Sequence, residues 1–502
     1  MPQEIGIIDL FAGPGGLAEG FSSVKKADGS RAMKVELSIE KEAVEVRTLQ
    51  LRTFLRGFEH GFPQEYYEAL NSGSNLPDWA ELYPRRWEAA CQEARQIELG
   101  SPQAFEEIEP ILKSTRERYH GHTVLIGGPP CQAYSLAGRS RNRGKVGYVA
   151  EDDHRHFLYR EYVRILDALN PAAFVMENVK GMLSSKVGGG EIFQRVLDDL
   201  RNAGDGYQLM PLAAERHGGE INARDFVVRA EEHGVPQARH RVFIVGLRND
   251  LMPPAGAQPL LQPVTASDSW TSVSEVISDM PRIRSGLSRQ PDDAALWQRQ
   301  ILDQAGLIRA ASDVDAKIRQ AARRLLDGEA VFPSQRKATR SFGIRGEGKT
   351  DLERWLRDPN LARIQDHDTR SHIPGDLGRY LFAALYGAEH GSSPKLSQFP
   401  EALQPQHRNR ASGAFADRFR VQVESRPSST VTSHISKDGH YFIHPDPAQA
   451  RSLTVREAAR LQTFPDNYHF CGNRTRKYHQ VGNAVPPYLA FKIGEVIRDL
   501  ID

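Results

Sequence analysis

The sequence predicts an α/β fold with a mostly parallel, doubly wound sheet. The first observation is that short apolar runs alternate with stretches of helical spacing through residues 4–250. Strands that alternate with helices form parallel sheets covered by helices on both faces. The second observation is that glycine- or proline-rich turns follow two of these runs, at "FAGPGG" (11–16) and "GGPPC" (127–131). Because open α/β sheets bind ligands at the carboxyl ends of their strands, these turns mark the expected site.

The first part of the chain shows this alternation clearly. The segment 4–21, "EIGIIDLFAGPGGLAEGF", is expected to form a buried strand, a glycine-rich turn and a helix that begins near Leu17. A second strand is expected at 35–40, ending on Glu40, followed by a helix at 41–54. Residues 55–122 are rich in helix formers and charge, and we expect an insertion between strands there.

Further elements are expected after the insertion. The predicted strands are "TVLI" (123–126), "AAFVME" (172–177) and "RVFIVGLR" (241–248), and the predicted helices are 152–171, 191–204 and 454–464. From about residue 250 to 425 the alternation is lost, while proline, serine and arginine increase. We therefore expect a core at 1–250, a separate region at 251–425, and a C-terminal segment at 426–502 that returns to the core.

Composition limits the classes of protein that this chain can represent. Hydrophobic residues make up 39% and charged residues 26%, which is typical of a folded globular protein. No stretch approaches the roughly 20 apolar residues that a membrane span needs, and no signal peptide is recognisable. The three cysteines, Cys91, Cys131 and Cys471, are far apart and form no CxxC pair. We therefore expect no disulfide framework, no metal site, no membrane association and a cytoplasmic location.

Charge is spread unevenly along the chain. The net charge is only +1, but residues 281–425 carry 24 Lys and Arg against 18 Asp and Glu. Such a surplus fits either a basic surface for a polyanion or an ordinary solvated surface.

The turn after the first strand is suited to a nucleoside ligand. Gly13, Gly15 and Gly16 allow the backbone to approach such a ligand closely. Glu40, at the end of the second strand, is placed to accept hydrogen bonds from ribose hydroxyls. The pattern is FxGxGG and not the dinucleotide GxGxxG, so a cofactor without phosphates is favoured over NAD.

Cys131 follows a strand end on unusually stiff backbone. Pro129 and Pro130 fix their own φ angles and restrict the residues before them. On this fragment alone, Cys131 is either a nucleophile or a small buried thiol. Glu177 is expected to stand beside it, because consecutive strands are usually neighbours. In "QARHR", Gln237, Arg239 and Arg241 are two apart, so an extended segment would project all three from one face.

Taken together, the motifs resemble those of the cytosine-C5 DNA methyltransferases of the bacterial modification type. The shared motifs, in the family's order, are "DLFAGPGG", "GGPPCQAYS", "MENV", "QARHR", "RPSSTVTS" and "VGNAVPP". The resemblance covers about 1–250 and 426–502. It implies a Rossmann-like fold that depends on S-adenosylmethionine, with a smaller target-recognition domain at 251–425. The family's acidic cofactor contact after the third strand is not visible in this sequence.

The resemblance also implies roles for individual residues. Cys131 would attack carbon 6 of cytosine, Glu177 would hold the N3 and amino edge, and Arg239 and Arg241 would assist at the base, the phosphate or the catalytic loop. The base must be flipped out of the duplex to reach Cys131. The implied S-adenosylmethionine contacts are Phe11, Gly13, Gly15, Gly16, Glu40, Pro129 and Asn483. The implied DNA contacts are Gln132, Ser135, Arg139, Arg141, Arg143, Lys145 and Gln237, most of them in a loop expected to close over the base.

The implied partners are duplex DNA and a restriction endonuclease acting on the same site, and we expect a monomer. Three alternatives remain at this point. An RNA methyltransferase of the same family would not need a region as large as 251–425, and a dinucleotide-dependent oxidoreductase would not need the pairing of Cys131 with Glu177. A catalytically inactive DNA-binding relative is disfavoured because the identifiable catalytic positions are intact.

Overall fold

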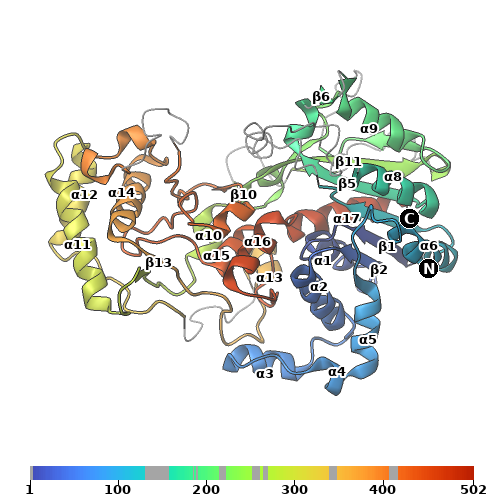
Figure 1. The fold of residues 1–502 in the computed structure, drawn as a ribbon, viewed down its shortest axis with the longest axis horizontal. Helices are drawn as coiled ribbons and strands as arrows, with labels where there is room; N and C mark the ends of the chain where they lie inside the picture. The colour runs from blue at the N-terminus through green and yellow to red at the C-terminus, as the bar shows by residue number, and fades with distance from the viewer. Residues whose placement is uncertain are drawn as a thin grey trace.

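The computed structural model describes residues 4–130, 158–184, 186–187, 190–213, 222–251, 261–263, 270–338, 348–405 and 417–501. These residues form a large lobe built on the central sheet and a smaller helical lobe that lies beside it (Figure 1). Both chain ends lie in the large lobe.

The central sheet has the order β3-β2-β1-β4-β5-β11-β8, with β9 also paired to β11. Its first five strands in this order are mutually parallel, whereas β11 runs antiparallel to β5, β8 and β9. The predicted, mostly parallel sheet is therefore confirmed. The strands are β1 Ile5–Leu10, β2 Met33–Glu40, β3 Ala94–Gln96, β4 Thr123–Gly127, β5 Ala173–Val179, β8 Tyr207–Met210, β9 Val227–Arg229 and β11 His240–Arg248.

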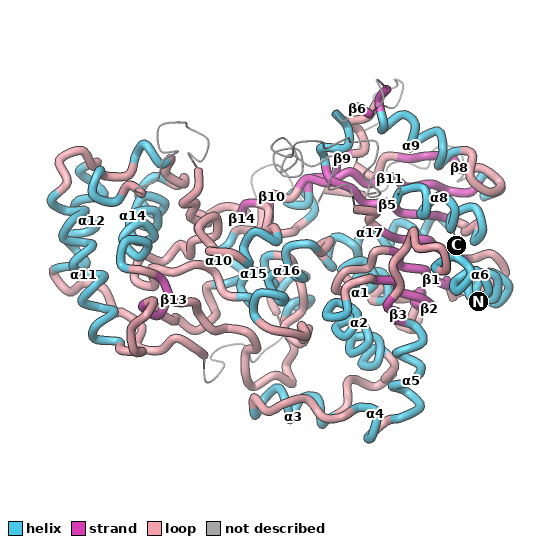
Figure 2. Tube along the Cα trace, in the orientation of Figure 1, coloured by secondary structure: helices cyan, strands magenta, loops and turns pink. Residues whose placement is uncertain are grey.

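Helices cover both faces of the sheet (Figure 2). One face packs against α6 Ala104–Arg118, α8 Leu158–Leu169 and α9 Ile192–Arg201. The other packs against α1 Gly16–Ser22 and α17 Pro487–Ile501. The strands β1 and β4 are buried at every position because both of their faces are covered, which explains their continuous apolar sequences.

The C-terminal helix α17 lies unusually close to α1. A Cβ atom on Gly16 would lie 2.2 Å from the carbonyl oxygen of Val485, and one on Gly20 would lie 2.4 Å from the backbone nitrogen of Phe491. Only glycine permits this contact, so the "GPGG" turn and the "VGNAVPP" segment are packed against each other although they lie at opposite ends of the chain.

The predicted insertion at 55–122 is too long. Its latter part supplies β3, which pairs with β2, and α6, which covers the sheet. The part outside the alternating α/β pattern is residues 57–93, and we use "the insertion" for these residues from here on. It contains α3 Gln64–Ser72, α4 Trp79–Leu82 and α5 Pro84–Glu93, and it follows α2 Ala43–Arg56.

The smaller lobe contains most of the described part of 251–425. Its core surrounds the buried Trp297 and joins α11 Ala294–Ala310, α12 Ala316–Leu326 and α14 Pro374–His390. The short strands β12 Gly286–Leu287 and β13 Ser371–His372 pair beside it. The cluster also includes Ile443 and Ala450, so the packing of this lobe extends past the boundary expected at 425.

Helix α15, Val455–Leu461, joins the two lobes. Its Arg456 donates from Nε to the carbonyl oxygen of Gln365 at 3.1 Å, and Arg460 donates from Nη1 to that of Val276 at 2.8 Å. Both arginines are buried. Two short helices of the predicted separate region, α10 Val273–Ile277 and α13 Asp351–Leu356, pack in the same hydrophobic cluster as α15. Helix α16, Arg474–Asn483, contributes to the same hydrophobic cluster.

Candidate active site

The glycine-rich turn after β1 contains three residues with positive φ, two of which are glycines. Phe11, Gly13 and Gly15 have φ angles of 56°, 56° and 91°, in the left-handed region that favours glycine. The backbone N–H of Gly13 donates to Oε2 of Glu40 at 2.9 Å. The turn and the end of β2 are therefore held together by this hydrogen bond.

This part of the site fits S-adenosylmethionine. Oε1 of Glu40 accepts the backbone N–H groups of Lys41 and Glu42, at 2.8 and 2.9 Å, so the carboxylate is fixed at the strand end. A Cβ atom on Gly13 would meet nothing within 4 Å, which leaves open space beside the turn. A fixed carboxylate next to open space suits the two hydroxyls of a ribose.

The residue at the end of the third strand was not predicted from the sequence. Gln96 pairs with Glu40 across β2 and β3, and its Nε2 donates to the carbonyl oxygen of Lys41 at 3.0 Å. An amide thus occupies the strand end where the family resemblance implies an acid. Because β3 contains only three residues, "ARQ", no apolar run identified it in the sequence.

The turn after β4 leads to Cys131 and lies against β5. Residue Gly127 pairs with Met176, which places the start of this turn beside Glu177. A Cβ atom on Gly128 would lie 2.9 Å from Oε2 of Glu177, so the carboxylate closely approaches the Gly128 backbone. The side-chain amide of Asn178 donates to the carbonyl oxygen of Pro129 at 3.2 Å. The Glu-Asn pair of β5 therefore contacts the Gly-Pro backbone that precedes Cys131.

Glu177 forms an ion pair with Arg241. Oε1 of Glu177 lies 3.0 Å from Nε of Arg241, and the two side chains are 14% and 17% exposed. Burial lowers the pKa of Arg241, and the neighbouring Glu177 carboxylate opposes this effect. Arg241 and Glu177 are thus a partly buried pair at the carboxyl end of β5, with the acid facing the turn.

Arg239 and Gln237 lie deeper in the protein. Burial, and then the nearby Arg241, lower the pKa of Arg239, whose Nη1 donates to the carbonyl oxygen of Val431 at 2.9 Å. Gln237 is fully buried: its Oε1 accepts the N–H of Val431 at 2.7 Å and its Nε2 donates to Gln462 at 2.8 Å. The expected DNA contact of Gln237 is therefore corrected, because its amide is used to join β10 Gln237–Ala238 to the C-terminal segment.

The C-terminal "VGNAVPP" segment lies next to the glycine-rich turn. Asn483 is exposed at the end of α16, and Gly482 before it packs on the backbone of Thr432 and Ser433. Two residues after Asn483, the carbonyl of Val485 meets Gly16. Asn483 therefore lies in a segment that packs against the glycine-rich turn.

Several predicted site residues lie outside the described ranges. These are Cys131, Gln132, Ser135, Arg139, Arg141, Arg143 and Lys145. Within the part of the chain that is described, no group of three or more His, Cys, Asp or Glu residues could hold a metal ion, and no helix is long and apolar enough to cross a membrane.

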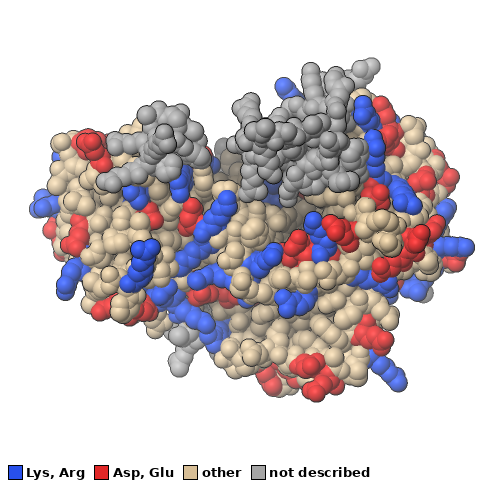
Figure 3. All heavy atoms as spheres, in the orientation of Figure 1, with Lys and Arg blue, Asp and Glu red and all other residues tan. Residues whose placement is uncertain are grey.

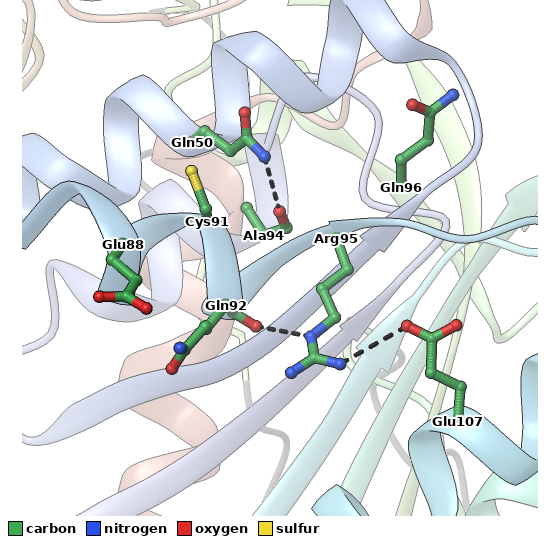
Figure 4. A pocket seen from close by; sticks show the side chains of 8 residues that line it. All are labelled: Gln50, Glu88, Cys91, Gln92, Ala94, Arg95, Gln96 and Glu107. Carbon is green, nitrogen blue, oxygen red and sulfur yellow. Dashed lines mark hydrogen bonds and ion pairs between the residues drawn. The ribbon is translucent and has the colours of Figure 1, made fainter. Parts of the chain in front are cut away.

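A cavity of about 400 Å³ is lined by residues of α2, α5, β3 and α6 (Figure 4), and Gln96 is the residue that it shares with the site described above. Its polar groups bind one another: Gln50 donates to the carbonyl of Ala94, and Arg95 donates to that of Gln92 and pairs with Glu107. Its lining contains neither Glu177 nor the glycine-rich turn, so we do not assign it to the reaction.

The sheet order, the turn after β1 and the acid after β2 define a Rossmann-like methyltransferase fold. A crystal structure from E. coli, described as a DNA modification methyltransferase encoded within a prophage, is 18% identical and covers 99% of both chains with a TM-score of 0.55. This likeness supports the fold class alone.

Sequence comparison identifies the family. The model of the C-5 cytosine-specific DNA methylases matches residues 46–499. The type II methyltransferase M.Bpa9945I of Bacillus paralicheniformis is 32% identical over 99% of each chain. The type II methyltransferase M.AgeI of Thalassovita gelatinovora is 28% identical over 90% of this chain and 99% of its own. The chain belongs to the C-5 cytosine-specific DNA methylase family, whose members depend on S-adenosylmethionine.

Proposed function

We propose that this chain methylates carbon 5 of a flipped-out cytosine in a specific duplex DNA site through a covalent bond to Cys131. The observation that carries this proposal is the contact between Glu177 and the backbone of Gly128, three residues before Cys131. Arg241 fixes the Glu177 carboxyl group beside the turn that leads to the Cys131 thiol. Methylation of cytosine at carbon 5 requires such a thiol and such a carboxyl group close to each other.

The chemistry follows from the electronic structure of cytosine. Carbon 5 is a poor nucleophile while the ring is aromatic. Addition of the Cys131 thiolate to carbon 6 forms the S–C6 bond and moves the C5–C6 π electrons towards carbon 5, which can then attack a methyl group. Loss of the carbon 5 proton and cleavage of the S–C6 bond restore the aromatic ring and release the thiolate.

Glu177 and Arg241 act on the opposite edge of the base. Glu177 would bind the N3 and amino edge and stabilise a proton or positive charge at N3 as the adduct forms. Arg241, whose Nε lies 3.0 Å from Oε1 of Glu177, would hold that carboxylate in place and contact the base carbonyl. Arg239, held by Val431, would keep the "QARHR" segment and Arg241 in position.

The methyl donor would occupy the other side of the turn. S-adenosylmethionine supplies an electrophilic methyl group when bound. Glu40 would accept the ribose hydroxyls, and the turn from Phe11 to Gly16 would lie against the nucleoside. Gln96 would stand near the adenine, and Asn483 would close the pocket from the C-terminal side.

We further propose that residues 251–425 read the DNA sequence and that the loop containing Arg139 and Lys145 closes over the flipped base. Lys and Arg side chains are numerous between the two lobes on the face seen in Figure 3, where phosphates could be met. The enzyme would act as a monomer and protect DNA against an endonuclease that cuts the same site.

Sequencing the methylated cytosines in DNA from a host that expresses the chain tests this proposal. We expect one short sequence context with methylation at carbon 5, and none with the Cys131→Ser variant. Methylation of tRNA and not duplex DNA would contradict the proposed substrate. Replacing 251–425 with the matching region of a relative of known specificity should then change the methylated sequence. An active chimera with the original specificity would contradict the role proposed for this region.

A further inference from the structure

The insertion does more than extend the large lobe, because it contacts the chain that leads into the smaller one. We call residues 357–370 the linker: it connects α13, which packs with α15, to β13 and α14 of the smaller lobe. In Figure 1, α3 lies at the lower edge of the molecule, well away from the central sheet. Its contacts therefore need a reason other than support of the sheet.

Helix α3 binds the linker through an extended set of hydrogen bonds. Asn71 makes a reciprocal pair: its Nδ2 donates to the carbonyl of Asn360 at 2.9 Å, and its Oδ1 accepts the N–H of Ala362 at 2.7 Å. The carbonyl of Leu70 accepts Nε2 of Gln365 at 2.6 Å. Such pairing fixes the backbone of the linker along the helix.

Apolar packing supports the same contact. Leu361 of the linker is 4% exposed and belongs to a cluster whose other buried members all come from α2 and the insertion, including Phe54, Tyr66 and Trp79. The linker is thus anchored by a side chain buried in the insertion, in addition to its polar contacts.

Asp358 is the point where three parts of the chain meet. Its Oδ2 accepts the Tyr67 hydroxyl of α3 at 2.7 Å and the Asn467 side-chain amide at 2.6 Å. Oδ1 of Asn467 in turn accepts Nη1 of Arg52 at 3.1 Å, and Arg52 forms a buried ion pair with Glu19 of α1. Helix α1 begins at the glycine-rich turn, so polar contacts run from the cofactor side of the site to the linker.

We propose that the insertion braces the smaller lobe on the catalytic core, with Tyr67, Asn71 and Asp358 as positioning residues for DNA recognition. This inference rests on the proposed function of 251–425 as the region that reads DNA. In the described part of the chain, the hydrogen bonds of Tyr67, Asn71 and Asp358 involve neither Glu177 nor Arg241. It limits the orientations of the smaller lobe before DNA binds, which reduces the entropy lost on binding.

The test uses Tyr67→Phe and the double variant Tyr67→Phe/Asn71→Ala in the full chain. Each removes brace hydrogen bonds, whereas the matched control Tyr83→Phe removes a hydroxyl that bonds to Glu65 within the insertion. For the double variant we expect the KM for duplex DNA to rise about threefold to tenfold, with kcat and the affinity for S-adenosylmethionine near wild type. Discrimination against sites with one changed base pair should fall. The Tyr83→Phe variant should change neither the KM for duplex DNA nor this discrimination.

Asp358→Asn keeps an acceptor for Tyr67 and should restore most of the DNA affinity that Asp358→Ala loses. If the double variant does not fold, Tyr67→Phe alone tests the proposal. This substitution removes only one oxygen atom, so we expect the variant to fold. Unchanged KM and discrimination in a folded Tyr67→Phe variant, or an equal loss of cofactor affinity, would overturn the proposal. A wild-type chain that does not methylate duplex DNA would instead contradict the proposed function, which separates the two failures.

Discussion

Oε1 of Glu177 lies 3.0 Å from Nε of Arg241, across the antiparallel pair of β5 and β11. Phe243 is directly opposite Glu177, and Arg241 is opposite Val179, so the two charged residues are diagonal neighbours. Strand β11 thus brings the Arg241 cation to the carboxyl end of β5. The other neighbour of β5 is β4, and the turn after β4 leads to Cys131.

Glu177→Gln should lower the single-turnover rate of methyl transfer by about 100-fold or more. The amide can still hydrogen-bond the base edge, but it cannot stabilise positive charge at N3 or accept a proton there. Because that interaction develops mainly in the transition state, DNA and cofactor affinity should change little. Rapid-quench transfer at the wild-type rate would remove Glu177 from the mechanism.

Gly128→Ala should reduce kcat by about 100-fold without unfolding the protein. The added Cβ would lie 2.9 Å from Oε2 of Glu177, and the carboxylate would have to shift from the position in which Arg241 holds it to relieve this contact. Gly306→Ala in α11 is the matched control, since its Cβ would meet nothing within 4 Å and alanine favours a helix. Thermal unfolding and methyl transfer should be measured for both. Equal activity of the two variants would contradict the placement of Glu177 against Gly128.

Acid should destabilise the folded chain through buried neutral histidines. Burial lowers the pKa of His367 to about 4, of His372 to about 3 and of His469 to about 4, against about 6.5 when unfolded. Between these values the unfolded chain binds more protons, so the free energy of unfolding falls as the pH drops from about 6.5 towards 4. Denaturant unfolding at several pH values measures this slope.

The variant His372→Phe should flatten that slope. The ring of His372 packs at 4.8 Å on Tyr380 and its Nε2 has no hydrogen-bond partner in the described structure, so phenylalanine can replace it. Replacement of the exposed His60 by Gln is the control and should leave the slope unchanged. A slope unaffected by His372→Phe would show that this histidine does not contribute to it.

Local sequence patterns were sufficient to predict the central strands of the sheet and the turn after the first strand. Continuous apolar runs predict the fully buried strands β1 and β4, and closely spaced glycines predict the turn after β1. These signals are local and do not depend on residues far away in the sequence. Strand β3 could not be found this way, because three residues at a sheet edge are too few to form a pattern. The burial of Gln237 was equally inaccessible, since its partner Val431 is 194 residues away. The bracing role proposed for the insertion likewise depends on contacts between α3 and a linker nearly 300 residues later.

The central claim is that Cys131 is the nucleophile, and a duplex with 5-fluorocytosine at the target position tests it most directly. Fluorine at carbon 5 cannot leave as a cation, so elimination stops with the protein bound through sulfur. We predict a denaturation-resistant complex that accumulates when S-adenosylmethionine is present and that maps to Cys131. It should be absent in Cys131→Ser, because a hydroxyl is a much poorer nucleophile at neutral pH. The serine variants of Cys91 and Cys471 should still form it. A complex that persists without Cys131, or that maps to Cys91 or Cys471, would contradict the account.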